Sequence, residues 1–153
     1  SGTTTAGPAR QLRGRRLTVI ASSLAVVDEL RDEVSIELIV LGGVLRHNYL
    51  SLVGMLTEQA LGQLRANLCF LSGSGIREGG HVMDTTSIEV PVKRAMVAAA
   101  QRTVLLVDRT KFPGTGLLSV CGPDQISVLI TNRGADQTTL DIFQSAGTEV
   151  ITV

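Results

Sequence analysis

The sequence predicts an α/β fold, a doubly wound and mostly parallel sheet with helices on both faces. Two observations support this fold class. Runs rich in Val, Ile and Leu recur along the chain, with little of the alternation expected of a sheet that is buried on one face only. Helical segments lie between most of these runs, and a repeated strand–helix–strand order implies right-handed crossovers between parallel strands.

Each predicted strand is one of these apolar runs. In chain order the strands are residues 17–21, 36–41, 68–72, 104–107, 127–131 and 150–153. Sheets of this kind bind ligands beyond the carboxyl ends of their strands. We therefore expect a functional site in the loops that follow the strands.

The predicted helices have recognisable ends. The first is expected to begin at Ala6, with Thr5 as its simplest N-cap and Pro8 in its first turn. The others are residues 24–31, 52–64, 91–101 and 139–146. Pro91 cannot sit deep in a helix, so that helix must start near residues 88–90. Gly147 is expected to end the last helix as a C-cap.

The composition favours one globular domain that spans residues 1–153. Fourteen basic and fourteen acidic residues cancel, so the chain lacks the positive field that holds a nucleic-acid backbone, and a small ligand is expected. Cys69 and Cys121 lack CxxC spacing and indicate buried, reduced thiols of a cytoplasmic protein. His47 and His81 lack the spacing of metal ligands, so no metal site is expected. No apolar run reaches the ~18 residues of a membrane span, and no membrane contact is expected.

A turn rich in glycine and hydroxyl groups opens the chain, formed by Ser1, Gly2, Thr3, Thr4 and Thr5. Glycine lets a ligand approach the backbone, and the N–H groups at a helix start have no intrahelical partner. The helix dipole adds roughly 0.3–1 kcal/mol for an anion, and each hydrogen bond to a charged group about 1.5–3 kcal/mol. One helix needs one capping hydroxyl, so the surplus favours a phosphate site over an ordinary N-cap. A strand should precede this turn, and we expect residues upstream of the chain to supply it.

Two further glycine-containing loops follow predicted strands. Gly42 and Gly43 allow a tight reversal, after which Arg46 either reaches an anion or points into solvent. Residues 72–76 form a Ser-Gly-Ser-Gly-Ile loop with too little bulk to block a ligand. Its GxGxxxG spacing departs from the dinucleotide fingerprint, and without GxSxG the hydroxyl of Ser74 is no catalytic nucleophile. No cofactor is expected.

Three further regions of the chain carry basic side chains. Lys93 lies in the first turns of its helix, where a cation opposes the helix dipole. An anionic partner would offset this, so Lys93 is either a ligand contact or a flexible side chain in solvent. Asp108 and Lys111 follow the fourth strand and form either part of a site or a surface salt bridge worth under about 1 kcal/mol. The arginines within residues 10–16 are expected to form a solvated face without a site.

The order of these motifs resembles the carboxyl-terminal effector domain of DeoR-type bacterial transcriptional regulators. The motifs are SGTTT at 1–5, LGGVLR at 41–46, LSLVG at 50–54, GSGI at 73–76, KRAM at 93–96, VDRTKF at 107–112 and LITN at 129–132. The similarity runs over essentially all 153 residues. That family's domain is similar in fold to ribose-5-phosphate isomerase and glucosamine-6-phosphate deaminase, which also use a Ser/Gly/Thr loop for phosphate.

The resemblance implies a domain that senses a phosphorylated sugar or a related metabolite. A helix-turn-helix domain would precede Ser1 and make the contacts with operator DNA, and a homo-oligomer is expected because such regulators read two-fold operators. By resemblance, Ser1, Gly2, Thr3, Thr4 and Thr5 would hold the phosphate. Gly43, Arg46, Ser74, Lys93 and Lys111 would lie around the sugar.

The chain departs from the family pattern at Ser74, where members commonly have an acidic residue. Serine cannot act unaided as a general base, which favours a sensor over an enzyme. Asp84 or Glu89 could still supply a carboxylate, so a sugar-phosphate isomerase or an amino-sugar phosphate deaminase is the alternative. Residues 81–86 also differ from the common family loop and are candidates for setting sugar selectivity.

Overall fold

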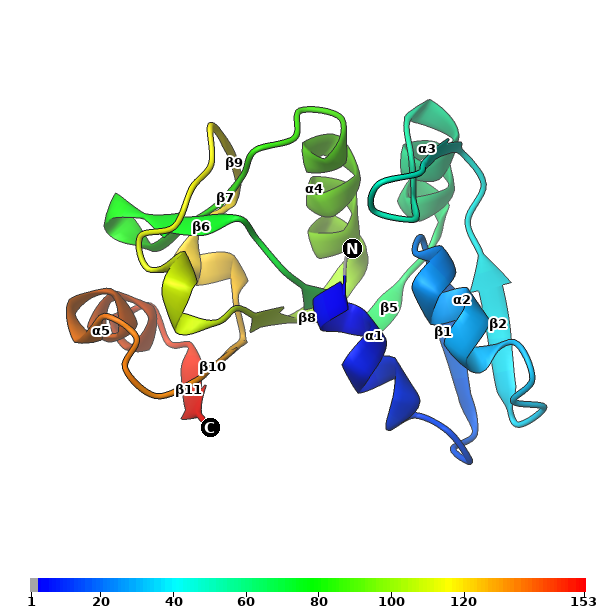
Figure 1. Cartoon of the computed structure of the whole chain (residues 1–153), viewed down its shortest axis with the longest axis horizontal. Coiled ribbons are helices and arrows are strands. Elements are labelled where there is room, and N and C mark those ends of the chain that lie inside the picture. Colours follow the sequence, from blue (N-terminus) through cyan, green and yellow to red (C-terminus); the bar gives the residue numbers. More distant parts are fainter. Residues whose placement is uncertain (1–2) are drawn as a thin grey trace. The chain divides into compact units, whose positions relative to one another are not determined.

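The computed structural model describes residues 3–153 of the chain, with side chains from Gly7 onward (Figure 1). The chain divides into two compact units, Ser1–Ala60 and Leu61–Val153. Among the described residues, no helix combines the length and the apolar character that crossing a bilayer requires. Each unit has its own parallel strands, and we describe the two in turn.

The first unit contains a pair of parallel strands and a pair of packed helices. Its elements are α1 (Thr3–Arg10), β1 (Leu17–Ala21), α2 (Leu24–Leu30), β2 (Ile36–Val40), β3 (Val44–Arg46), β4 (Ser51–Val53) and the start of α3 (Met55–Gln63). β1 pairs with β2 in parallel, and β3 with β4 in an antiparallel hairpin. α1 packs against α2, and Ala9, Leu30 and Ile36 form a small buried cluster there.

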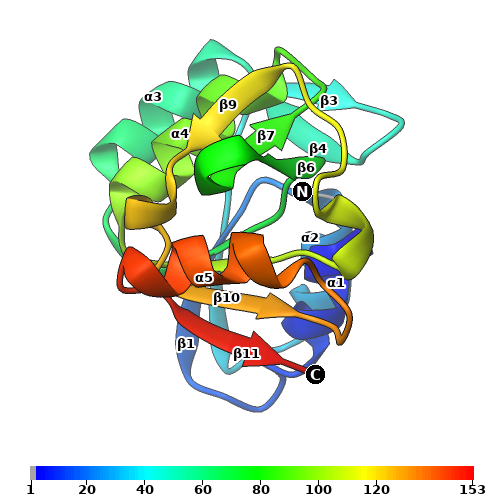
Figure 2. The same ribbon diagram turned by 90° about the vertical axis from the view of Figure 1, so that its left-hand side faces the viewer.

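The second unit is built on a four-stranded parallel sheet. Its strands are β5 (Ala66–Leu71), β8 (Ala100–Leu106), β10 (Val128–Thr131) and β11 (Glu149–Thr152), in the spatial order β11-β10-β8-β5. Leu71 pairs in register with Leu105, and Leu105 with Leu129, so these three side chains share one face. They belong to a core that also holds side chains of α4 (Glu89–Ala99) and α5 (Gln137–Ser145). Figure 2 shows α5 running across β10 and β11.

A small antiparallel sheet lies beside α4 in the same unit. Its strands are β6 (Gly75–Arg77), β7 (His81–Asp84) and β9 (Leu118–Cys121), in the order β6-β7-β9. Short 3₁₀ turns connect the elements: η1 (Glu78–Gly80), η2 (Arg109–Lys111) and η3 (Pro123–Gln125). Val82 and Val120 bring this sheet into the main core of the unit. None of these three strands was predicted, because they do not stand out in the sequence as continuous apolar runs.

The predicted α/β class is confirmed, because a parallel sheet flanked by helices forms the second unit. All six predicted strands are present, as β1, β2, β5, β8, β10 and β11, and α4 begins at Glu89 as the position of Pro91 required.

Two predicted helix starts are wrong. Residues 52–54 are not helical, because Ser51–Val53 pairs with β3 as strand β4, and α3 begins only at Met55. α1 begins at Thr3 and contains Pro8, so Thr5 is inside the helix rather than its N-cap.

Candidate functional site

The predicted phosphate turn falls at the edge of the described structure. Ser1 and Gly2 lie outside the described residues, as do the side chains of Thr3, Thr4 and Thr5. The backbone of the three threonines forms the first turn of α1. The first N–H groups of a helix have no partner within it and carry the positive end of its dipole. The phosphate turn stays a prediction.

Gly43 and Arg46 lie on the first unit, in and after the turn between β2 and β3. Gly43 has a φ of +146°, and a Cβ atom there would meet the Val53 carbonyl oxygen at 2.6 Å and collide with the Thr57 hydroxyl. That hydroxyl donates to the Gly42 carbonyl oxygen at 2.6 Å. Glycine is therefore needed at Gly43 for the turn to lie close to α3 and β4, whether or not it meets a ligand.

Arg46 does not simply extend into solvent. Its guanidinium carbon lies 4.6 Å from the centre of the Tyr49 ring, and the side chain is half-buried. Such a cation–π contact is worth about 0.5–1 kcal/mol at an exposed site and leaves the edge N–H groups able to donate elsewhere. The contact holds Arg46 in place beside the hairpin.

Lys93 has an anionic partner, and that partner belongs to the protein. Its Nζ lies 2.5 Å from Oδ2 of Asp84 and donates a second hydrogen bond to the Ser72 carbonyl oxygen at 2.8 Å. Both charged side chains are only 7% exposed. The alternative of a solvated lysine is wrong. Asp84 was predicted only as a spare carboxylate, because its pairing depends on β7, which the sequence pattern did not indicate.

The other carboxylate oxygen of Asp84 stabilises the turn that leads into α4. Oδ1 accepts a hydrogen bond from the Thr86 backbone N–H at 3.0 Å, and the Thr86 carbonyl oxygen accepts from the Glu89 N–H at 3.0 Å. Asp84 therefore joins the end of β7, the start of α4 and, through Lys93, the end of β5. A carboxylate that accepts from both a cation and a backbone N–H is held in one orientation.

Two hydroxyl side chains on the loops after β5 and β7 contact each other. Ser74 follows β5 and Thr85 follows β7, and their hydroxyl oxygens are 3.4 Å apart. Both side chains reach solvent, unlike Lys93 and Asp84. We call Ser72, Ser74, Asp84, Thr85 and Lys93 the Lys93 cluster.

Lys111 lies close to the same cluster, because residues 112–116 pass directly over Ser74 and Gly75. Gly75 and Gly114 form an antiparallel bridge, and the Thr115 N–H donates to the Ser74 carbonyl oxygen at 3.1 Å. A Cβ atom on Gly114 would lie 2.7 Å from the Ser74 carbonyl oxygen and 2.9 Å from Cα of Lys111. Three predicted residues, Ser74, Lys93 and Lys111, thus belong to one region at the carboxyl end of β5.

Asp108 stabilises the turn η2 by accepting hydrogen bonds from Thr110. Its Oδ1 accepts from the Thr110 N–H at 2.8 Å and from the Thr110 hydroxyl. The hydroxyl hydrogen bond is the main reason that the pKa of Asp108 lies below its ordinary value. The Arg109 N–H donates to Oδ1 of Asn132 at 2.7 Å, which ties the end of β8 to the end of β10.

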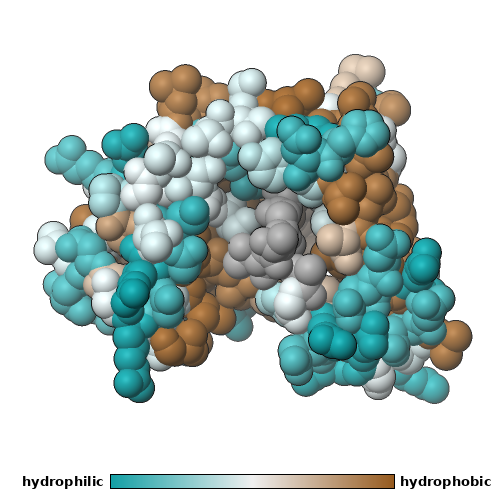
Figure 3. Space-filling view, viewed as in Figure 1, coloured by the Kyte–Doolittle hydropathy of each residue, from teal (hydrophilic) through white to brown (hydrophobic). Residues whose placement is uncertain are grey.

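Two arginines at and after the end of α1 are paired with acidic residues in and after α2. Arg13 lies 2.8 Å from Glu29 and 3.8 Å from Glu33, and Arg10 lies 3.7 Å from Glu29. Figure 3 shows hydrophilic surface at its lower right, over this part of the first unit. These arginines are a solvated face, as predicted, but one that also holds α1 against α2.

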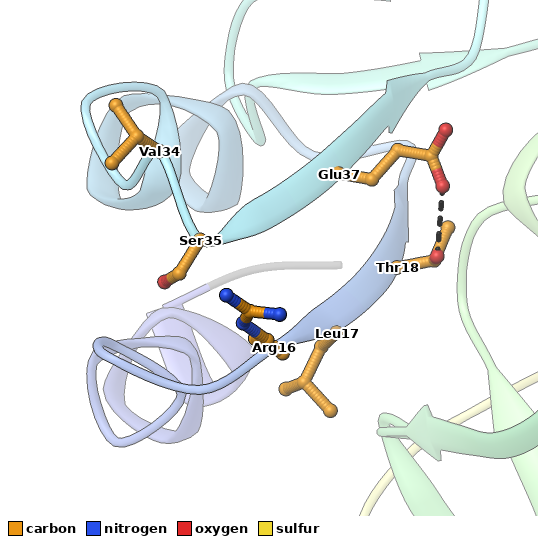
Figure 4. A pocket seen from close by; sticks show the side chains of 6 residues that line it. All are labelled: Arg16, Leu17, Thr18, Val34, Ser35 and Glu37. Carbon is orange, nitrogen blue, oxygen red and sulfur yellow. Dashed lines mark hydrogen bonds between the residues drawn. The ribbon is translucent and has the colours of Figure 1, made fainter.

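An open depression of about 620 Å³ lies at the amino ends of β1 and β2. Its lining residues are Arg16, Leu17, Thr18, Val34, Ser35 and Glu37, and the Thr18 hydroxyl donates to Glu37 at 2.9 Å (Figure 4). None of the predicted site residues lines it. It is at the opposite end of its strands from the expected site, and the Glu37 carboxylate would repel a phosphate.

Within the described part of the chain, no three His, Cys, Asp or Glu side chains are grouped as a metal would require. Cys69 and Cys121 are both free and buried, as predicted.

The family described as the DeoR C terminal sensor domain matches residues 1–133. The chain belongs to this family. The resemblance inferred from the order of the motifs is thereby confirmed.

Three relatives of this DeoR sensor domain are bacterial regulators. The HTH-type transcriptional regulator GolR of Listeria innocua is 32% identical over 143 residues, 93% of this chain and 56% of GolR. The L-fucose operon activator of Haemophilus influenzae is 30% identical over 76% of this chain and 47% of its own length. The putative aga operon transcriptional repressor of Escherichia coli O157:H7 is 30% identical over 100% of this chain and 57% of its own length. The chain spans about half the length of these regulators.

Proposed function

We propose that this domain is the sensing half of a sugar-operon regulator. It binds a phosphorylated sugar or a related metabolite, with the phosphate on Ser1 to Thr5 and the sugar near Gly43, Arg46 and the Lys93 cluster. Binding changes how tightly a helix-turn-helix domain of the same regulator holds operator DNA. The names of the relatives support this, since one is an HTH-type regulator and two control the L-fucose and aga operons.

The observation that carries the proposal is the Lys93 cluster with the loop above it. Lys93 donates to the Ser72 carbonyl oxygen just after β5, and the hydroxyl of Ser74, two residues further on, contacts that of Thr85, in the loops beyond the carboxyl ends of strands where parallel sheets bind ligands. The backbone of Lys111, at the end of η2, lies next to Gly114 of the loop that crosses Ser74 and Gly75. These are the polar groups that orient a sugar, which offers hydroxyls as both donors and acceptors.

A sensor is favoured over an isomerase or a deaminase because the nearby carboxylates are poor general bases. Asp84 is held by Lys93 and by the Thr86 N–H, and Ser74 stands where an acidic residue is common in the family. The lowered pKa of Asp108 makes its carboxylate a weaker base. Abstraction of a proton next to a carbonyl therefore lacks a suited group among the described side chains of this cluster.

The switch must come from unequal binding to two states of the regulator. An effector that binds both states equally shifts nothing, and turning a 1:99 mixture into 99:1 needs about 5.5 kcal/mol of preference. A homo-oligomer fits this scheme, because paired helix-turn-helix domains read two-fold operators.

A thermal-shift screen tests the binding. Phosphorylated sugars should raise the melting temperature of the purified chain, whereas the same sugars without phosphate should not, because only ligands of the folded state stabilise it. Thr4→Val should weaken the shift without changing the fold. Thr18→Val, an exposed threonine in β1, is the matched control and should keep it.

The proposal fails if no phosphorylated compound stabilises the protein, or if Thr4→Val and Thr18→Val behave alike. Turnover of ribose 5-phosphate or glucosamine 6-phosphate by the purified chain would instead favour the enzyme alternative.

A further inference from the structure

We infer that the β3–β4 hairpin and the start of α3 form the surface through which two copies of this chain pair. We call it the pairing surface, and its exposed apolar side chains are Val44, Tyr49, Leu50, Met55 and Leu56. All five belong to the first unit. The inference goes beyond the proposed function by naming where the homo-oligomer forms, and its link to the effector rests on that function.

The pairing surface leaves much apolar area in contact with water. Val44, Met55 and Leu56 are 64%, 67% and 61% exposed, and Figure 3 shows hydrophobic surface over α3. Val44 lies next to Gly54, the residue before Met55, because its methyl group is 4.0 Å from where a Cβ atom on Gly54 would lie. Five large side chains that are each about half exposed or more present on the order of 500 Å², near the upper limit for the largest apolar patch of a monomer.

The size of this patch suits a stable dimer. β3 and β4 have three residues each, so the hairpin is about 10 Å long and both of its ends fit within one interface. A standard interface buries about 800 Å² on each partner. The five side chains would supply roughly 60% of that area, which is the apolar share usual in homodimer interfaces.

The charge of this segment favours a second copy as the partner. Among residues 38–57, Arg46 is the one residue that is Asp, Glu, Lys or Arg, and its guanidinium carbon lies 4.6 Å from the centre of the Tyr49 ring. In a two-fold pair each patch meets itself, so a charge near the axis meets its like. A nearly uncharged patch therefore suits its own copy, whereas a charged partner would be attracted by charges of the opposite sign.

The backbone at Leu50 is an independent observation on the same surface. Among the described residues, Leu50 is the one non-glycine with a positive φ, +50°. Leucine is strained in this left-handed conformation, which glycine or asparagine adopts more readily, and such strain is found mainly at ligand clamps and switch regions. At 43% exposed, the side chain is only partly buried by its own chain. Contact with a second copy therefore explains this leucine better than the folding of one chain does.

The same hairpin carries two residues of the proposed effector site. Gly43 precedes β3, and Arg46 is its last residue. An effector that moves Arg46 would also move the Tyr49 ring that stacks on it, and Tyr49 is part of the pairing surface. The arrangement of two subunits sets the spacing of their helix-turn-helix domains on an operator. The hairpin would thus couple effector binding to DNA binding.

Sedimentation equilibrium of the purified chain tests the pairing. At about 50 µM the wild-type chain should sediment as a dimer, because interfaces of standard size have a Kd in the micromolar range or below. Met55→Glu should raise the dimer Kd by at least about tenfold, since it brings two like charges into the interface. The matched control is Val34→Glu. Val34 is fully exposed, precedes β2 and lies outside the pairing surface, so this variant should pair like the wild type.

Leu50→Asn separates pairing from folding. Alone, it should raise the dimer Kd by about threefold or more, because it removes an apolar side chain from the interface. In the Met55→Glu background, where the chain is monomeric, it should leave the melting temperature unchanged or raise it, since asparagine tolerates the left-handed conformation.

Three results would overturn the inference. The first is a wild-type chain that is monomeric at about 50 µM, which would leave this surface to another occupant such as the proposed DNA-binding half. The second is a Met55→Glu variant that pairs as tightly as Val34→Glu. The third is a Leu50→Asn substitution that lowers the melting temperature of the monomer and leaves the dimer Kd unchanged.

The proposed function is tested separately with the same proteins. Phosphorylated sugars should still raise the melting temperature of Met55→Glu, because Met55 is not part of the effector site. If they stabilise neither this variant nor the wild type, the proposed function fails, whereas the pairing surface is still decided by the sedimentation data.

Discussion

Gly75 and Gly114 let two loops of the second unit lie backbone against backbone. A Cβ atom on Gly75 would come within 2.6 Å of the Pro113 carbonyl oxygen and 2.5 Å of the Thr115 nitrogen. These are backbone atoms, so the contact cannot be relieved by turning a side chain. The close approach brings residues 112–116 over Ser74, and with them Lys111 to the Lys93 cluster.

We expect Gly75→Ala to lower the free energy of unfolding by about 1–3 kcal/mol, because the added methyl group forces the two loops apart. Urea unfolding measures this. Gly62→Ala is the control, since Gly62 lies in α3 with nothing within 4 Å of its would-be Cβ atom. That substitution should raise the free energy by up to about 1 kcal/mol. Equal effects of the two substitutions would refute the explanation.

The two cysteines predict a dependence of stability on alkaline pH. Burial raises the pKa of the Cys69 thiol to about 11 and that of the Cys121 thiol to about 12. In the unfolded chain a thiol has a pKa of about 8.5. Above that pH the unfolded chain loses these protons first, so the stabilisation is fully present below about pH 8.5 and is lost as the pH rises toward 11–12.

Urea unfolding under reducing conditions at pH 8 and pH 10 checks this prediction. The wild-type protein should lose more stability between the two pH values than the variant with Cys69→Ala and Cys121→Ala. Identical losses would mean that the buried thiols do not contribute.

At the scale of elements, α3 holds the turn that carries Gly43. Thr57 of α3 is fully buried, and its hydroxyl donates to the Gly42 carbonyl oxygen at 2.6 Å. Hydrophobic side chains at the start of the same helix face solvent, among them Met55 and Leu56, and Figure 3 shows hydrophobic surface over α3. The helix is thus fixed to the β2–β3 turn by one buried polar contact.

Thr57→Val should cost about 0.5–1.5 kcal/mol of unfolding free energy, because the valine keeps the shape of the buried side chain but removes its hydrogen bond to the Gly42 carbonyl oxygen. The control is Thr18→Val, whose hydroxyl contacts the exposed Glu37, and which should change stability by less than about 0.5 kcal/mol. Chemical denaturation of both variants measures the two changes in unfolding free energy. A neutral Thr57→Val would show that the turn does not depend on this hydrogen bond.

At the scale of the whole molecule, the two units differ in how much apolar surface they bury. Most of the buried apolar side chains described lie in the second unit, where a single core runs from Cys69 of β5 to Phe143 of α5. In the first unit, the cluster between α1 and α2 has only Ala9, Leu30 and Ile36 as its buried members among the described residues. Regions with larger cores open less often.

Hydrogen exchange should therefore be slowest in the second unit. We expect the amides of Leu105 and Leu129, in the two central strands of its sheet, to be the most protected. Those of Val19 and Leu38, in β1 and β2, should exchange faster at neutral pH. Equal protection of all four amides would show that the chain opens only as one cooperative unit.

The order of the six parallel strands and of the helices between them could be predicted from the sequence alone, because a buried parallel strand is a continuous apolar run that is visible without its partners. The order of the motifs was likewise enough to predict the family. Gly43, Arg46, Ser74 and Lys111 were named from loops that follow predicted strands, and Lys93 from its place in the first turns of a helix. What the sequence could not supply were contacts between residues far apart in the chain.

Only the tertiary structure decided that Lys93 pairs with Asp84 and that residues 112–116 cross Gly75. Both contacts depend on β6, β7 and β9, strands of three or four residues whose pairing is set by the packing around them. The residues of these three strands show no clear hydrophobic periodicity in the sequence. The partner of a buried charge can be identified only in the folded chain.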